Sequence, residues 1–172
     1  MFTGSSSIEQ WGTLPADFPR LRVVNRGIGG TGLADLLAFA PLLVYPLGPK
    51  LIVIYAGEND LAEGRTPEEI VRRFEQLCGQ VRQFAPRARW LFLSLKPSPC
   101  RPELLGAVRD TNTRLAVRAA RERHGTFVDV CTPMLGADGR ARGELFVEDR
   151  LHLNAAGYQL WARILAPILL AH

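Results

Sequence analysis

The chain has 172 residues, of which 47% are apolar and 22% are charged, and its formal net charge at pH 7 is +4. This length and composition predict one globular domain, residues 1–172, and exclude disordered, fibrous and coiled-coil chains. No window holds ~18 consecutive apolar residues, so we expect no membrane-spanning helix. The 3 cysteines and 3 histidines show neither a disulfide framework nor zinc-ligand spacing, so we expect no metal and no cofactor.

The basic residues are nearly all arginines, scattered over predicted helical faces without interleaved aromatic side chains. This distribution is typical of solvated helix surfaces, so we expect no nucleic-acid partner. Three basic residues in predicted loops could meet an acidic substrate, but we favour solvated surface charge for Lys96, Arg101 and Arg142. The N-terminus has neither the basic start nor the apolar run of a signal peptide, which predicts a cytoplasmic location.

The predicted strands are short apolar runs. Phe2–Thr3 is interpreted as the stub of a truncated first strand, which leads into Gly4-Ser-Ser-Ser7. Later runs predict strands at Leu21–Val24, Leu51–Tyr55, Trp90–Leu95 and Phe127–Val130. A run that is apolar on both faces, such as the one ending at Tyr55, suits a central strand of a parallel sheet.

Helical patterns lie between these runs. Thr66-Pro-Glu-Glu69 combines a Thr cap, a proline at the first helical position and a Glu three residues after the cap, and the pattern that follows stops at Pro86. A second helix is expected from Pro102 to Gly125, and a third from Ala155 to about Ala171, bent or shortened by Pro167. The alternation of strand and helix predicts a three-layer α/β/α fold with a parallel sheet.

Polar residues follow several of these strands, at the edge where parallel sheets carry their sites. The sequence Asn25-Arg-Gly-Ile-Gly-Gly-Thr-Gly32 is expected to be a turn. Its Gly27–Gly32 part matches G-x-G-x-x-G, but no acidic residue stands at the end of the next strand, so a dinucleotide site would be incomplete. The same backbone amides would suit a developing oxyanion. Farther on, Asp149 precedes His152 by three residues in a polar loop.

Four segments together resemble the SGNH (GDSL-type) hydrolases. The segment Phe2–Ile8 is similar to the family's first motif, and Asn25–Gly30 to its second. Gly57-Glu-Asn-Asp60 and Asp149-Arg-Leu-His152 are similar to the motifs Gly-x-Asn-Asp and Asp-x-x-His. The four segments stand in the family's order and span nearly the whole chain. The resemblance implies a flavodoxin-like sheet of about five strands in the order 2-1-3-4-5.

The resemblance also implies roles for individual residues. Ser6 would be the nucleophile, His152 its base and Asp149 the group that orients the base. The oxyanion would meet the amides of Ser6 and Gly30 and the side chain of Asn59. The chain departs from the pattern at Ser5, where the family has Asp, and at Gly29, where Ser is common.

The expected activity is hydrolysis of a small carboxylic ester, with a short acyl or acetyl group, in an open site. Two alternatives are kept: a non-catalytic binding protein of the same fold, and a nucleotide- or phosphate-binding module that uses Gly27–Gly32. Because three serines are adjacent, Ser5 or Ser7 remains conceivable as the nucleophile. The sequence does not indicate the oligomeric state.

Overall fold

The structure, a computed structural model that describes residues 1–171, contains a five-stranded sheet in the order β2-β1-β3-β4-β5. All four strand pairs are parallel. The strands are β1 (Phe2–Gly4), β2 (Asn25–Gly27), β3 (Leu51–Tyr55), β4 (Arg89–Leu93) and β5 (Gly125–Val128). The expected fold class and strand order are therefore confirmed.

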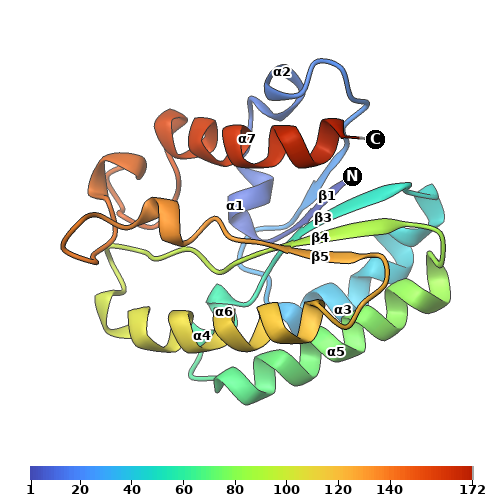
Figure 1. The fold of residues 1–172 in the computed structure, drawn as a ribbon, viewed down its shortest axis with the longest axis horizontal. Coiled ribbons are helices and arrows are strands. Elements are labelled where there is room, and N and C mark those ends of the chain that lie inside the picture. Colours follow the sequence, from blue (N-terminus) through green and yellow to red (C-terminus); the bar gives the residue numbers. More distant parts are fainter. Residues whose placement is uncertain (172) are drawn as a thin grey trace.

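Helices cover both faces of this sheet (Figure 1). The helices are α1 (Ser6–Glu9), α2 (Leu14–Asp17), α3 (Leu33–Leu43), α4 (Glu58–Ala62), α5 (Pro67–Phe84), α6 (Leu105–Ala119) and α7 (Ala155–Leu170). Four short 3-10 helices lie at Tyr45–Leu47, Pro102–Leu104, Thr132–Met134 and Gly143–Leu145. Helices α3, α5 and α6 lie below the sheet in Figure 1, whereas α1 and α7 lie above it. Within residues 1–171, none of the helices combines the length and apolarity needed to cross a membrane.

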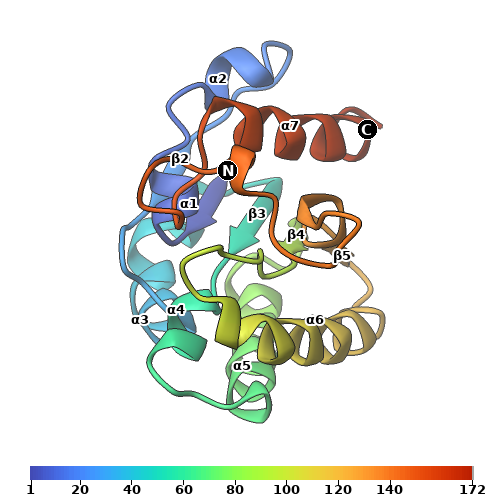
Figure 2. The same cartoon turned by 90° about the vertical axis from the view of Figure 1, so that its left-hand side faces the viewer.

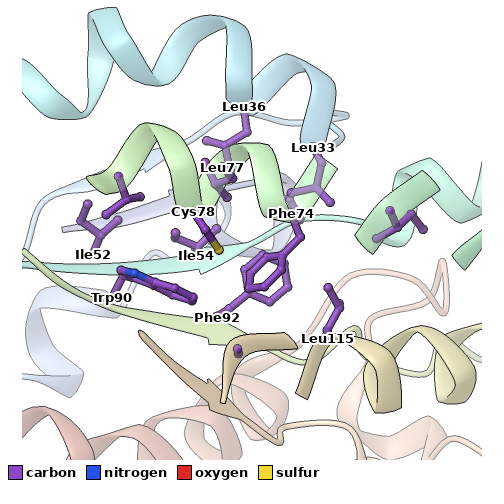
Figure 3. Close-up of a cluster of buried hydrophobic side chains, with 14 of the residues drawn as sticks. Leu33, Leu36, Ile52, Ile54, Phe74, Leu77, Cys78, Trp90, Phe92 and Leu115 are labelled. Atoms are coloured by element: carbon purple, nitrogen blue, oxygen red, sulfur yellow. The ribbon is translucent and has the colours of Figure 1, made fainter. Parts of the chain in front are cut away.

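The sheet separates two apolar cores. One core joins β3 and β4 to helices α3, α5 and α6, and Figure 3 shows Phe74 of α5 against Phe92 of β4. Their rings lie 4.7 Å apart in an edge-to-face arrangement, which stabilises a pair beyond its buried area. The other core joins the opposite sheet face to α1 and α7, where Trp11 stacks on Tyr158 with ring centroids 5.2 Å apart.

The central strand β1 is short but paired on both sides. It lies between β2 and β3, and the Met1 ammonium donates to the carbonyl oxygen of Leu51 at 2.9 Å. Gly4 ends the strand with φ +134, and a Cβ there would lie 1.8 Å from the carbonyl oxygen of Tyr55. Only glycine combines this conformation with this approach. The backbone therefore stays close against β3 as far as Ser5, whose amide donates to the Tyr55 carbonyl at 3.0 Å.

The second predicted strand was wrong in position. Residues 21–24 are not a strand, and the second strand begins at Asn25, inside the expected turn. The pairing with β1 sets this boundary, because Asn25 is the partner of Phe2, the first residue of β1, and Val24 contributes only its carbonyl, which accepts from the Phe2 amide at 2.8 Å. Pro167 lies inside α7, but the helix continues to Leu170.

Helix α5 begins at the predicted capping box. The Thr66 hydroxyl accepts from the Glu69 amide at 3.2 Å, and the Glu69 carboxylate accepts from the Thr66 amide at 2.9 Å. We expect Thr66→Ala to lower the free energy of unfolding by ~1 kcal/mol, because it leaves a helix amide without its acceptor. Urea unfolding would measure this loss. Thr113→Ala, an exposed change inside α6, is the control and should change stability by less than ~0.5 kcal/mol.

Candidate active site

The predicted site residues lie at the carboxyl edge of the sheet, which faces the viewer in Figure 2. Ser6 is the first residue of α1, two residues beyond β1. Asn59 lies in α4, directly after β3, and Gly30 lies in the loop between β2 and α3. The structure therefore places at one edge side chains that are far apart in the sequence.

Ser6, His152 and Asp149 form a continuous hydrogen-bonded chain. The Ser6 Oγ lies 3.1 Å from Nε2 of His152, and Nδ1 of the same ring lies 2.6 Å from Oδ2 of Asp149. The hydroxyl would donate to Nε2 when Nδ1 carries the ring proton and donates to the carboxylate. This arrangement gives a hydroxyl, a base and a group that orients the base.

The loop that carries His152 is shaped by Asp149 itself. The amides of Leu151 and His152 both donate to Oδ1 of Asp149, at 2.8 and 2.9 Å. The hydrogen bond from the His152 ring, followed by these two amide bonds, lowers the pKa of Asp149 from 3.8 to about 2. At neutral pH the ring therefore faces an ionised carboxylate.

Asn154 anchors the end of this loop to α7. Its side-chain oxygen accepts from the amides of Ala156 and Gly157, and its side-chain nitrogen donates to the carbonyls of Glu144 and Phe146. Sequence reasoning did not assign this residue a role, although an Asn directly before a helix is a typical N-cap. The cap fixes the distance between His152 and the helix.

The neighbouring serines are placed differently from Ser6. Ser5 and Ser7 are buried, whereas Ser6 is partly exposed. Among residues 1–171, Ser6 is the one serine whose hydroxyl lies within hydrogen-bond distance of His152. The main chain of Ser5 is held in place, because its amide donates to the Tyr55 carbonyl and its carbonyl accepts from the Ile8 and Glu9 amides.

Three groups are expected to donate to the oxyanion, namely the amides of Ser6 and Gly30 and the side chain of Asn59. Among residues 1–171, the amides of Ser6 and Gly30 have no acceptor within hydrogen-bond distance. Gly30 is exposed and has φ +75, a conformation that glycine adopts without strain. The Asn59 side chain donates to the Thr31 carbonyl at 3.2 Å, which fixes its amide group beside the glycine loop. Two free amides and one tethered side-chain amide suit a developing negative charge.

Two amides at the end of the glycine loop already have carboxylate acceptors. The amides of Gly32 and Leu33, at the start of α3, donate to the carboxylates of Asp35 and Asp60 at 2.8 and 2.9 Å. Asp60 is also paired with Arg73. A bound phosphate would have to displace these carboxylates and would meet their negative charge. These two amides are therefore not free to bind a phosphate as the amides of a nucleotide-binding turn do.

A buried ionic cluster lies directly next to Asn59. The Glu58 carboxylate accepts from Lys96 at 2.7 Å, from the Tyr55 hydroxyl at 2.7 Å and from the Ser98 hydroxyl at 2.5 Å. Arg101 approaches it at 3.3 Å. Lys96 is 1% exposed, so its interpretation as a solvated surface charge was wrong. Arg101 is also paired with this carboxylate, and Arg142 binds Glu144.

The pKa of Glu58 reflects two opposed effects. Burial alone would raise it, but the Lys96 ammonium and the hydroxyls of Ser98 and Tyr55 lower it below the ordinary value. Burial, reinforced by the adjacent Glu58, raises the pKa of Tyr55, which remains a neutral donor. The sequence contained one signal of this cluster, since Lys96 directly follows the apolar strand and is one of only two lysines in the chain.

No group of three or more His, Cys, Asp or Glu side chains within residues 1–171 is arranged to hold a metal ion. The third histidine, His172, lies outside the described residues.

Comparison with known proteins shows a consistent similarity. A sequence model of the GDSL-like lipase/acylhydrolase family matches residues 3–160. A Streptococcus pneumonia protein provisionally named a platelet activating factor has a TM-score of 0.86 and 25% identity, over 98% of this chain and 82% of that chain. A GDSL-like lipase from Bacteroides thetaiotaomicron has a TM-score of 0.85 and 23% identity, over 99% of this chain and 86% of that chain.

A third similar structure is a variant of an acetyl-xylooligosaccharide esterase from Geobacillus Stearmophilus. It has a TM-score of 0.75 and 19% identity, over 96% of this chain and 91% of that chain. None of the curated proteins matches the chain.

Proposed function

The chain belongs to the GDSL-like lipase/acylhydrolase family, and on this premise we propose that it is a serine esterase that cleaves short-chain acyl or acetyl esters. The observation that carries the proposal is the hydrogen-bonded chain from the Ser6 hydroxyl through His152 to the ionised Asp149. No metal or cofactor takes part in the proposed reaction.

Acylation begins at the Ser6 hydroxyl. Nε2 of His152 takes the hydroxyl proton while Oγ forms a bond to the ester carbonyl carbon, and Asp149 stabilises the imidazolium. The resulting oxyanion accepts from the amides of Ser6 and Gly30 and from the Asn59 side chain. The imidazolium then gives its proton to the leaving alcohol as the carbon–oxygen bond breaks. Water repeats the sequence on the acyl-enzyme, which releases the acid and restores Ser6.

The direct test combines turnover with labelling of the nucleophile. The protein should hydrolyse 4-nitrophenyl acetate, and a serine-directed fluorophosphonate should modify one serine, identified as Ser6 by peptide mass spectrometry. Labelling of Ser5 or Ser7 would contradict the assignment of the nucleophile. Absence of both turnover and labelling would instead favour a non-catalytic binding protein. Because a similar structure is that of an acetyl-xylooligosaccharide esterase, acetylated oligosaccharides are the first natural esters to assay.

Replacing Asn59 tests the oxyanion site. Asn59→Ala should lower kcat by ~10²–10³-fold with little change in KM, because the lost donor acts on charge that develops only in the transition state. Steady-state kinetics with 4-nitrophenyl acetate would show this. The nearby Gln10→Ala, an exposed change on the turn after α1, should leave kcat within ~2-fold. An equal loss in both variants would argue for a general effect on folding.

The pH dependence follows from Asp149. Its pKa is about 2 in the folded chain and 3.8 without its partners, so its stabilising hydrogen bonds are complete above about pH 3.8 and are lost as the pH falls toward 2. We therefore expect the acid limb of log(kcat/KM) to be no steeper than a slope of one, because Asp149 stays ionised and takes up no proton above pH 4. A profile measured from pH 4 to pH 9 would show this, and a slope of two would contradict it.

A further inference from the structure

A cavity lies beside the loop that carries His152. It has a volume of about 450 Å³ and lies between the segment from Pro97 to Pro102 and the side chains of Arg140 and Arg150. Ser98, whose hydroxyl binds Glu58, also lines it. The cavity is large enough to hold a small organic group.

Its position connects it to the reacting centre. Arg150 stands between Asp149 and His152, so its Cα lies within about 7.6 Å of the His152 Cα along the chain. The Cys100 amide donates to the Arg150 carbonyl at 3.1 Å, which joins the two walls of the cavity. The loop that carries His152 therefore supplies one wall of the cavity through Arg150.

The charge of the cavity is not balanced by the protein. Within residues 1–171, no carboxylate lies within 4 Å of the guanidinium group of Arg140 or of Arg150. Of the acids close in sequence to these arginines, Asp149 binds the His152 ring and Asp138 accepts from the Arg140 backbone amide. Two unpaired guanidinium groups that line one cavity favour an anion.

The backbone of Arg150 adds a second, independent observation. Its φ is +58, and it is the one residue other than glycine with a positive φ within residues 1–171. A side chain in this conformation costs free energy that glycine would avoid. A strained position that holds a long cationic side chain against a cavity points to a use for that side chain.

We propose that this cavity is a specificity subsite, in which Arg140 and Arg150 bind a carboxylate carried by the ester substrate. The carboxylate would accept from the planar donors of the guanidinium groups while the ester carbonyl lies at Ser6. The proposal rests on the proposed esterase activity for its kinetic consequence. It names the substrate class as esters that also bear a carboxylate.

The test compares 4-acetoxybenzoate with its neutral methyl ester, methyl 4-acetoxybenzoate. For each protein, kcat/KM for the anionic substrate is divided by kcat/KM for the neutral substrate. Each variant's ratio is then compared with the wild-type ratio, which cancels the different intrinsic reactivities of the two esters. We expect this ratio to fall about tenfold in Arg140→Gln and in Arg150→Gly. Arg87→Gln, an exposed change in a distant turn, is the matched control.

Arg150→Gly has a second readout. Because glycine relieves the positive φ, its thermal midpoint should equal or exceed that of wild type while selectivity is lost. The wild-type ratio should also decline as salt rises from 50 to 500 mM, since partly exposed charges are screened. A ratio that is unchanged in both cavity variants, or that changes equally in Arg87→Gln, would overturn the subsite.

A binding experiment separates this proposal from the esterase activity. Isothermal titration of Ser6→Ala with 4-hydroxybenzoate and with its methyl ester requires no turnover. Tighter binding of the carboxylate, lost on adding Arg140→Gln or Arg150→Gly, would support the subsite even if wild type hydrolysed no ester. Equal binding of the two compounds would refute the subsite and leave the esterase proposal standing.

Discussion

Ser6→Ala should reduce kcat for 4-nitrophenyl acetate by ~10⁴–10⁶-fold, because no other hydroxyl among residues 1–171 lies within reach of the His152 ring. His152→Ala should have a loss of similar size, since the hydroxyl is a weak nucleophile without a base. The two side chains act in one proton transfer. The double variant should therefore be no slower than either single variant, within about threefold, when rates are measured at high enzyme concentration.

The adjacent serines provide the matched controls. Ser5→Ala and Ser7→Ala change buried hydroxyls that make no contact with His152, and each should keep kcat within ~10-fold of wild type. Circular dichroism and thermal midpoints would show that every variant is folded. Substantial activity in Ser6→Ala, together with its loss in Ser5→Ala or Ser7→Ala, would transfer the nucleophile to a neighbour and contradict the proposed mechanism.

Lys96→Met should lower the free energy of unfolding by ~3–5 kcal/mol, because it removes one partner of a buried ion pair. We expect no larger loss of stability from any other variant proposed here. Lys96 and Glu58 are almost fully buried and lie 2.7 Å apart. Methionine matches the length of the lysine stem but leaves the Glu58 carboxylate without its main counter-charge. Urea unfolding would measure the loss as a lower midpoint with an unchanged slope.

Two further variants separate charge from packing. Adding Glu58→Gln to Lys96→Met removes the uncompensated carboxylate, so part of the lost stability should return. Arg82→Met breaks an ion pair with Glu122 in which the arginine side chain is 57% exposed, and it should cost less than ~1 kcal/mol. If Lys96→Met and Arg82→Met lowered the free energy of unfolding equally, the buried ion pair would contribute no more to stability than the exposed one, which would contradict the prediction.

The elements that the sequence predicted best are those with a complete local signal. The capping box at Thr66 marks the start of α5, and the predicted strand Leu51–Tyr55 has the same bounds as β3 in the structure. These signals depend on residues a few positions apart. The interpretation of residues 21–24 failed because a strand in a parallel sheet also requires a partner, and the partner here begins at Phe2. Local apolarity carries no information on that register.

In the candidate site, too, the sequence predicted the residues with a local motif but not the contacts that depend on the fold. The motifs placed Ser6, Asn59, Asp149 and His152 at strand ends, and the structure gathers them at one edge. The buried carboxylate partner of Lys96 could not be predicted, because Glu58 becomes its neighbour only when β3 and β4 pair. Most lysine side chains in proteins are exposed at the surface. Only the fold therefore distinguishes the buried Lys96 from the other basic side chains.

The close approaches of Gly4 and Gly27 have a consequence for altering this protein. A Cβ at Gly27 would lie 2.2 Å from the Glu9 nitrogen, and the clearance at Gly4 is smaller still. The wall that holds Ser6 therefore tolerates no variation at these two positions. The cavity beside the His152 loop is instead lined mainly by loop residues, at Pro97–Pro99 and at Arg140, Ala141 and Arg150. A mutant library confined to those loops would explore new selectivity while the half that carries the nucleophile stays intact.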